Sequence, residues 1–159
     1  MIDDDGLNRT VRFSLDAGAI APAQARRGDA GLDLATVKDE HVRGGAVGRF
    51  YTGISGVHLP EWAFALVHTR SSTRERWGLE IRTSVIDAGY RGPLFIGYRC
   101  VITPQNDPAG MGVVIPAGTR LAQLVIMRNE LDALAVSIVD EVDTTTSERG
   151  ANGFGSTGA

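Results

Sequence analysis

Residues 121–127 read Leu121-Ala122-Gln123-Leu124-Val125-Ile126-Met127, and this stretch is a strong indication of the fold class. It is a short apolar run of the length typical of a buried β-strand, interrupted by one amide side chain. Further runs of the same kind lie between turn-forming residues at positions 11–15, 64–68, 94–98 and 134–139. We therefore expect β-strands at all of these positions.

The distribution of glycine and proline supports an all-β chain. With 20 glycines and 6 prolines among 159 residues, turn-forming residues recur at short intervals, which favours short strands over long helices. One short helical pattern occurs at residues 72–77. We expect one jelly-roll-like β domain at residues 1–141, followed by a polar C-terminal arm at residues 142–159. Residues 104–112 should form a surface loop.

Charge and cysteine content exclude several functional classes. The formal net charge of -3 disfavours binding to a nucleic-acid polymer, which needs a basic surface to displace counterions. Cys100 is the single cysteine, so no disulfide can form within the chain, and a buried thiol in a reducing cytoplasm is the simplest interpretation. The histidines lack metal-ligand spacing, no apolar run is long enough to span a membrane, and the acidic N-terminus is unlike a signal peptide. We expect a cytoplasmic protein.

Three polar features interrupt the predicted strands. Arg70-Ser71-Ser72 begins the short helix and offers a guanidinium and two hydroxyls to an anion, although an ordinary serine N-cap would give the same sequence. Asp33 lies between two leucines and should point away from both, but an Asp beside a strand is more often a turn or cap residue. Gln123 carries a buried amide, which either bonds within the core or faces a ligand.

A carboxylate and an aromatic ring stand close together in residues 85–92, Val-Ile-Asp-Ala-Gly-Tyr-Arg-Gly. Asp87 and Tyr90 are separated by a short turn, and Gly89 suits a turn that needs a positive φ. Such a turn would bring the two side chains to one pocket. A turn-starting Asp followed by a strand Tyr is the plainer interpretation.

Residues 149–158, Arg-Gly-Ala-Asn-Gly-Phe-Gly-Ser-Thr-Gly, are almost free of apolar side chains and cannot contribute to a core. They offer a cation, an aromatic ring, two hydroxyls and several glycines, which suit a phosphorylated ligand that carries a ring. A flexible tail has the same composition. Because ordering the backbone costs about 1–2 kcal/mol per residue, we expect this tail to close over a ligand only transiently.

Five segments, at residues 29–34, 70–72, 85–92, 118–124 and 149–158, resemble in order and spacing the five motifs of the trimeric dUTPases (deoxyuridine triphosphate nucleotidohydrolases). The resemblance spans nearly the whole chain. It implies a distorted jelly roll that assembles into a homotrimer. It also implies three active sites, each built from all three subunits, and a C-terminal arm that crosses to a neighbour.

The resemblance implies hydrolysis of dUTP to dUMP and pyrophosphate. Asp87 matches the catalytic residue, a general base for the water that attacks the α-phosphorus. Mg²⁺ would be carried mainly by the triphosphate and by waters, one of which Asp33 would hold. The residues that match substrate-binding positions are Arg70, Ser71, Ser72, Ser84, Ile86, Tyr90, Gln123, Arg149, Phe154, Gly155, Ser156 and Thr157. Of these, Tyr90 would lie beneath the deoxyribose and Phe154 would stack on the base.

Three positions depart from the family pattern. Ser84 and Asn152 stand where glycine is usual, and Gly89 stands where an acidic or polar residue is common. The Asn at position 152 tolerates a positive φ better than most residues. The side chain of Ser84 would lie near the base and could alter affinity.

Two alternative functions remain open on the sequence alone. A dCTP deaminase, or a bifunctional dCTP deaminase and dUTPase, shares the fold but needs a glutamate in the strand after the hairpin, where Gly97 stands. The second alternative is a trimeric protein that binds a nucleotide or a protein partner without turnover. For that role, the loop at residues 104–112 is the expected partner surface.

Overall fold

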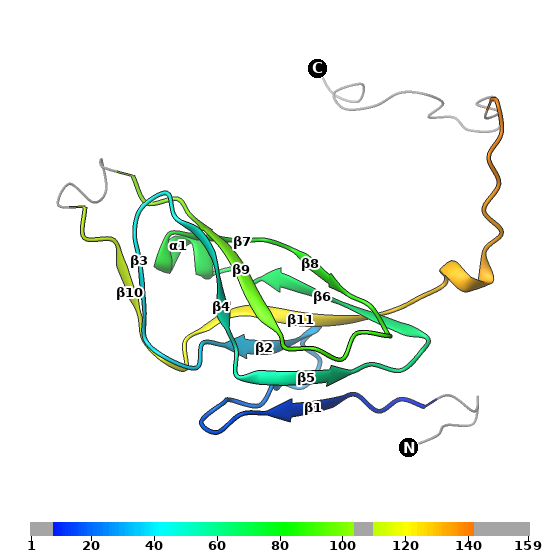
Figure 1. The fold of residues 1–159 in the computed structure, drawn as a ribbon, viewed down its shortest axis with the longest axis horizontal. Helices are drawn as coiled ribbons and strands as arrows, with labels where there is room; N and C mark the ends of the chain where they lie inside the picture. Colours follow the sequence, from blue (N-terminus) through cyan, green and yellow to red (C-terminus); the bar gives the residue numbers. More distant parts are fainter. Residues whose placement is uncertain (1–7, 104–109, 142–159) are drawn as a thin grey trace. The chain divides into compact units, whose positions relative to one another are not determined.

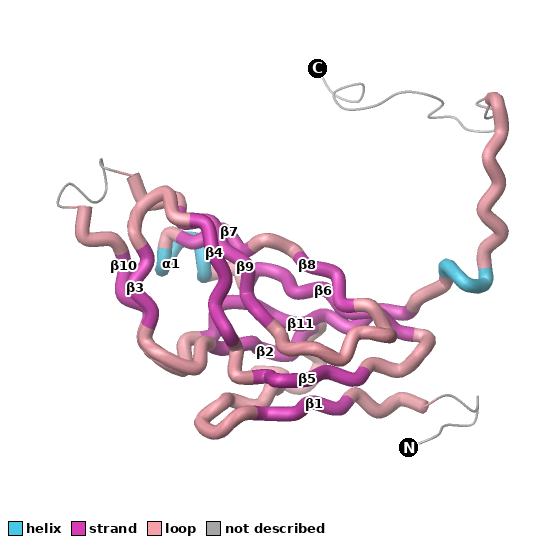
Figure 2. The backbone as a smooth tube through the Cα atoms, viewed as in Figure 1, coloured by secondary structure: helices cyan, strands magenta, loops and turns pink. Residues whose placement is uncertain are grey.

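A computed structural model of the chain describes residues 8–103 and 110–141. The chain divides into two units between Asn129 and Glu130. In the described part of the first unit, short strands dominate and one short helix is present, as Figures 1 and 2 show. The all-β expectation is therefore confirmed.

The first unit contains eleven strands and one helix in its described residues. The elements are β1 (Arg12–Leu15), β2 (Gly31–Ala35), β3 (Glu40–Val42), β4 (Val47–Tyr51), β5 (Ile54–His58), β6 (Ala63–Thr69), α1 (Thr73–Trp77), β7 (Leu79–Ile81), β8 (Ser84–Ile86), β9 (Phe95–Cys100), β10 (Val113–Ile115) and β11 (Arg120–Arg128). Strands β1, β6, β9 and β11 and helix α1 confirm five of the elements expected from the apolar pattern.

The longest strand, β11, occupies an interior position in a four-stranded sheet of order β2-β11-β6-β8. It pairs antiparallel with β2 on one side and with β6 on the other, which explains why its apolar residues Leu121 and Leu124 are fully buried. A second sheet has the order β4-β9-β7, and two-stranded sheets pair β1 with β5 and β10 with β3.

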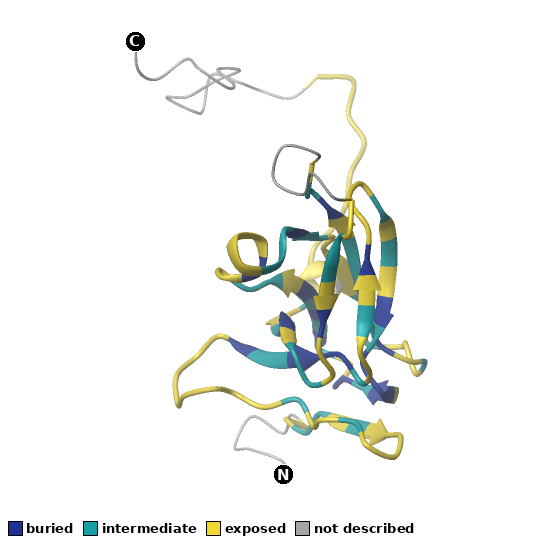
Figure 3. Ribbon diagram, turned by 90° about the vertical axis from the view of Figure 1, so that its left-hand side faces the viewer, coloured by how far each residue is buried: buried dark blue, intermediate teal, exposed yellow. Residues whose placement is uncertain are grey.

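The core lies between these sheets and is built from aliphatic side chains with one buried aromatic ring. The Phe50 ring is 1% exposed and stacks on Tyr98, with a distance of 4.1 Å between ring centroids. Figure 3 shows that buried and exposed residues alternate along several strands, as expected where one face of a sheet is covered. The single cysteine, Cys100, is buried in this core, as expected.

Residues 134–139 are not a strand, contrary to the expectation from their apolar pattern. In the second unit, the short 3₁₀ helix Leu131–Ala133 is followed by chain without regular structure up to residue 141. Leu134, Val136 and Ile138 are exposed, and Ile138 is 99% exposed. A strand needs a partner for its backbone groups, and within residues 130–141 no second strand is present.

A buried hydroxyl joins the strands that flank the hairpin between β7 and β9. The Thr52 hydroxyl donates to the carbonyl of Leu94 (2.8 Å) and accepts from the N–H of Ile54 (3.2 Å), and Thr52 is 2% exposed. Thr52→Val keeps the shape but leaves these backbone groups short of a partner. We expect the free energy of unfolding to fall by about 1–3 kcal/mol, measured by urea denaturation at fixed protein concentration.

The exposed Thr83 provides the matched control, because the same Thr→Val change there removes no buried hydrogen bond printed for that residue. It should alter stability by less than about 0.5 kcal/mol. A Thr52→Val protein that unfolds at the same urea concentration as the parent would contradict the role given to this hydroxyl.

Candidate active site

A hairpin whose two arms belong to different sheets forms the first part of the candidate site. Strand β7 pairs with β9, and the N–H of Arg82 donates to the carbonyl of Gly97 (2.8 Å). Beyond that bond the chain joins the other sheet, where β8 pairs with β6 and Ser84 lies opposite Val67. The arms of the hairpin therefore separate, and Figure 1 shows β8 and β9 diverging.

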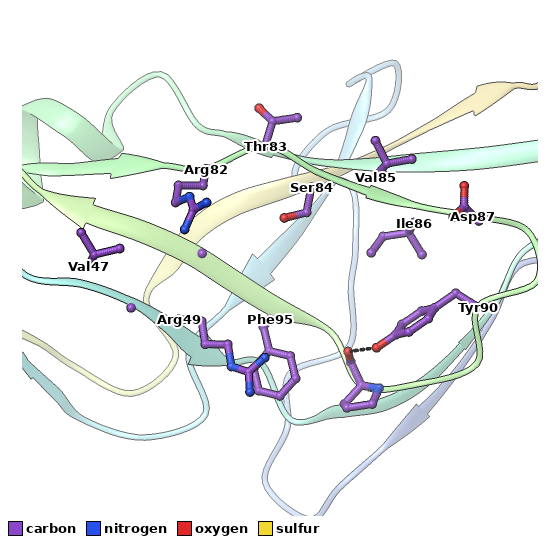
Figure 4. A pocket seen from close by; sticks show the side chains of 13 residues that line it. Val47, Arg49, Arg82, Thr83, Ser84, Val85, Ile86, Asp87, Tyr90 and Phe95 are labelled. Atoms are coloured by element: carbon purple, nitrogen blue, oxygen red, sulfur yellow. Dashed lines mark hydrogen bonds between the residues drawn. The ribbon is translucent and has the colours of Figure 1, made fainter.

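A cavity of about 670 Å³ lies between the separated arms. Figure 4 shows Ser84 and Ile86 pointing toward β9, whereas Val85 and Asp87 point to the other side of their strand, as strand alternation requires. The lining residues include the expected Ser84, Ile86, Asp87 and Tyr90. The sequence therefore placed these four residues correctly at one cavity, although their roles are not tested by geometry alone.

The turn from Asp87 to Tyr90 is present, but not in the conformation expected. The N–H of Tyr90 donates to the carbonyl of Asp87 (3.0 Å), which closes a tight turn. The expectation of a positive φ at Gly89 was wrong, because Gly89 is not among the glycines with positive φ. A turn without a positive φ is possible because Arg91 folds back and donates to the carbonyls of Ala88 (2.5 Å) and Tyr90 (2.8 Å).

The Tyr90 ring is held against the backbone at the end of this turn. Its hydroxyl donates to the carbonyl of Pro93 (2.9 Å), a bond drawn in Figure 4. A Cβ added to Gly92 would lie 2.6 Å from the Tyr90 hydroxyl oxygen, closer than side chains approach one another. The absence of a side chain at Gly92 is therefore what allows the Tyr90 ring to take this position.

A second cavity, of about 390 Å³, is rich in cationic side chains. Its lining residues are Arg70, Ser72, Arg76, Trp77, Pro116, Gly118, Thr119 and Arg120. Ser72 precedes α1 but makes no capping hydrogen bond with its side chain, so the interpretation as an ordinary serine N-cap does not hold. Helix α1 is fixed instead by Thr73, whose buried hydroxyl donates to the carbonyl of Leu121 (2.7 Å).

Asp33 lies beside this second cavity and contacts two arginines. It stands opposite Gln123 in the β2–β11 pair, and its side chain is 10% exposed. Its Oδ1 is 3.1 Å from Nε of Arg70, and its Oδ2 is 3.7 Å from Nε of Arg120. Oδ2 is buried and has no hydrogen-bond partner.

Two expected binding residues line neither cavity. The Gln123 amide donates to the carbonyl of Thr69 (3.1 Å) and lies against Gly31, where an added Cβ would be 2.8 Å from Oε1 of Gln123. Of the two alternatives for this amide, the structure shows hydrogen bonding within the protein. Ser71 is exposed and lies between Arg70 and Ser72 in the chain.

The remaining expected site residues lie outside the part of the chain that the structure describes. They are Arg149, Phe154, Gly155, Ser156 and Thr157, and the loop at residues 104–109 and Asn152 share this status. Sequence reasoning gave no role to three cationic side chains at the cavities, Arg49, Arg82 and Arg120. Arg120 could have been noticed, since it stands in the glycine-led segment at 118–124. Arg49, which lies over the Phe95 ring at 4.3 Å, carried no sequence signal.

Two searches of the described residues bear on metals and membranes. Among residues 8–103 and 110–141, no three His, Cys, Asp or Glu side chains gather into a group that could hold a metal ion. Within the same ranges, no helix has the length and apolar character needed to cross a membrane.

Comparisons with known proteins agree with this geometry. The family model described as dUTPase matches residues 17–158. The deoxyuridine 5'-triphosphate nucleotidohydrolase of Mycobacterium marinum is 39% identical over 154 residues, covering 95% of this chain and 96% of the relative. The enzyme of that name from Thermobifida fusca is 40% identical over 154 residues, covering 94% of this chain and 80% of the relative.

Solved structures show the same likeness in three dimensions. The Staphylococcus bacteriophage 80alpha dUTPase, solved with dUpNHpp, has a TM-score of 0.81 at 26% identity and covers 96% of this chain and 100% of the phage chain. A dUTPase from phage phi11 of S. aureus, described with a structural Mg(II) ion, has a TM-score of 0.71 at 25% identity, with 83% and 97% covered. The expected distorted jelly roll is confirmed by this likeness, and the chain belongs to the dUTPase family.

Proposed function

We propose that the protein hydrolyses dUTP to dUMP and pyrophosphate. Membership of the dUTPase family and relatives named deoxyuridine 5'-triphosphate nucleotidohydrolase support this activity. The observation that carries it is the cavity between β8 and β9, which presents a strand edge, an anchored tyrosine and a carboxylate to one ligand.

The cavity is suited to uracil because of its backbone. Strand β8 lies at the edge of its sheet with β6 as its neighbour, so its second backbone edge is unpaired in that sheet and lies at the cavity lined by Ser84, Val85 and Ile86. Uracil presents two carbonyl acceptors on either side of one N–H donor, a pattern that alternating backbone groups can match. Cytosine presents an amino donor and a bare ring nitrogen at two of these positions, which the same edge would leave unpaired.

Tyr90 supports selection of the sugar. Its ring lies flat against Gly92 with the hydroxyl bonded to Pro93, so that one face remains available to the deoxyribose. A 2′-hydroxyl on the ligand would meet this fixed ring. The anchored position of Tyr90 therefore favours a deoxynucleotide.

Asp87 acts as the general base. Its carboxylate is exposed on the turn and points away from Ser84 and Ile86, toward the side where the phosphates of a bound nucleotide would lie. As the water oxygen bonds to the α-phosphorus, the carboxylate accepts a proton from that water, and the bond from the α-phosphorus to the bridging oxygen breaks. Pyrophosphate leaves with the electron pair of that bond.

The arginine-lined cavity holds the phosphates. Arg70 and Ser72 line it, and Ser71 stands between them in the chain, which supports a phosphate-binding role for the motif. Gln123 contributes from the neighbouring strand. From the C-terminal arm at residues 142–159, Arg149, Ser156 and Thr157 contact the triphosphate, Phe154 stacks on the base and the Gly155 backbone approaches the ligand closely.

Mg²⁺ fits beside Asp33. The buried Oδ2 of Asp33 has no hydrogen-bond partner, which suits an acceptor for a water bound to the ion, and Mg²⁺ usually keeps several waters while binding substrate phosphates. When bound, the ion would neutralise charge on the triphosphate oxygens. Asp33 would hold it indirectly, through that water.

A homotrimer with shared sites follows from two features. The hairpin cavity and the arginine cavity share no lining residue, so a nucleotide that needs both can draw them from different subunits. Leu134, Val136 and Ile138 alternate along an exposed segment that leads toward the arm. A partner subunit offers the strand pairing that residues 130–141 lack within their own unit.

The two alternative functions receive less support. Among the described residues that line the hairpin cavity none is a glutamate, and Gly97 stands at the position where a dCTP deaminase needs one. A binding protein without turnover would not need the carboxylate of Asp87 at this cavity. Release of ammonia from dCTP would favour the deaminase.

Asp87→Asn tests the base. We expect kcat for pyrophosphate release from dUTP to fall by about 10²–10⁴-fold, because the amide cannot accept the proton, while the Kd for dUpNHpp changes little. Glu61→Gln, which removes an exposed carboxylate away from both cavities, serves as the control. Hydrolysis that continues at the parent rate in Asp87→Asn would eliminate Asp87 as the base.

Gly92→Ala tests the anchoring of Tyr90. The added methyl displaces the Tyr90 hydroxyl, so we expect the ratio of kcat/KM for dUTP to that for UTP to fall, as it should in Tyr90→Ala. Gly89→Ala is the matched control on the same turn, because a Cβ at Gly89 meets nothing within 4 Å and its φ is not positive. An unchanged ratio in Gly92→Ala would remove this contact from sugar selection.

A further inference from the structure

We propose that Arg120 is an additional phosphate-binding residue and that Asp33 is the positioning residue that holds Arg120 and Arg70 as a pair. The inference rests on the proposed function, because the phosphate-binding role of Arg70 is itself part of that proposal. It adds a ligand contact and a task for Asp33 that does not require a metal ion.

Strand pairing brings the two arginines together from distant parts of the chain. In the β6–β11 pair, Thr69 lies opposite Ala122, so Arg70 emerges from β6 beside the first residue of β11, Arg120. Nη1 of Arg70 donates to the backbone carbonyl of Arg120 (3.3 Å). The β2–β11 register shifts between Arg120 and Ala122, which marks an irregularity at this point of the strand.

One carboxylate faces both guanidinium groups. Asp33 contacts Arg70 through Nε (3.1 Å) and Arg120 through Nε (3.7 Å), and its side chain is 10% exposed. A single negative charge thus faces two positive charges, and this group carries a surplus of one positive charge. Like charges at this range repel each other unless a counter-charge lies between them, and Asp33 provides it.

The contacts to Asp33 leave the donors that a phosphate needs. An arginine carries five N–H donors in a rigid fork, and Arg120 directs its Nε at Asp33, so its terminal amino groups remain for a ligand. The Arg120 side chain is 56% exposed and lines the 390 Å³ cavity together with Arg70 and Ser72. Arg76 lines the same cavity, and three guanidinium groups suit a ligand with several negative charges, such as a polyphosphate chain.

The test measures binding of inorganic tripolyphosphate to the full-length protein in the presence of EDTA, by calorimetry or by the fluorescence of Trp77, which lines the cavity. Removing one charge-assisted contact should weaken binding by about tenfold or more, so we expect that rise in Kd for Arg120→Gln. Arg74→Gln is the matched control. It makes the same change in net charge on α1, but Arg74 pairs with Glu80 (3.2 Å) and does not line this cavity.

Asp33→Asn separates positioning from a general effect of charge. If Asp33 acted only as a negative charge near the anion, its removal would tighten tripolyphosphate binding. If it positions the two arginines, its removal weakens binding although the protein becomes more positive. We expect the weaker binding, and we expect the double variant Asp33→Asn/Arg120→Gln to lose less than the sum of the two single losses.

Thermal unfolding of each variant establishes that it folds, and Arg120→Gln tests the site at an exposed side chain if Asp33→Asn is unstable. The inference is overturned if Arg120→Gln binds tripolyphosphate as tightly as the parent and Arg74→Gln, if Asp33→Asn binds it more tightly, or if the parent does not bind it. These outcomes are independent of turnover. Arginine-dependent binding without dUTP hydrolysis would reject the proposed function alone, whereas active hydrolysis with unchanged tripolyphosphate affinity would reject this inference alone.

Discussion

The antiparallel pairing of β11 with both β2 and β6 is the constraint on which the rest of the site depends. This arrangement places residues of β2, of the segment after β6 and of β11 at one end of the four-stranded sheet. Asp33, Arg70 and Arg120 are far apart in the sequence, and they meet only because these strands are neighbours in this register. A shift of one residue in either pairing would turn the side chains to the opposite face of the sheet.

The second half of the site comes from a strand that leaves its own hairpin. Had β8 paired with β9, the two arms would have satisfied each other's backbone groups and closed the space between them. Because β8 pairs with β6 instead, the four-stranded sheet carries one wall of the cavity while the β4-β9-β7 sheet carries the other. The two cavities are thus connected mechanically through β6, which pairs with both β8 and β11.

The sequence predicted the class of fold well and the details of the site less completely. Apolar runs predicted β6, β9 and β11 because fully buried strands need continuous apolar side chains. Short strands such as β3, β7 and β8 were missed, since three residues give too little pattern to recognise. The run at 134–139 was wrongly predicted as a strand because an apolar pattern records what a segment can bury, and not whether a partner lies within the same chain.

Among the site residues, local motifs were the most informative. Asp87 and Tyr90 were placed at one cavity because a turn joins them, but the conformation of Gly89 depended on Arg91, whose backfolding no pattern records. The pairing of Asp33 with Arg120 could not be predicted, because it depends on strand register. Gln123 was recognised as a buried amide, and its partner, the Thr69 carbonyl, became evident only from the arrangement of the strands.

The exposed alternation of Leu134, Val136 and Ile138 has a consequence for handling the protein. A segment of this kind at high local concentration is a template for intermolecular β-pairing, and it carries few charges to prevent that pairing. Dilution, mild denaturant or truncation near residue 130 would therefore change how the purified material behaves on a sizing column before any chemistry at the nucleotide site is affected. Soluble expression would then report on how the chain ends meet as much as on how the β domain folds.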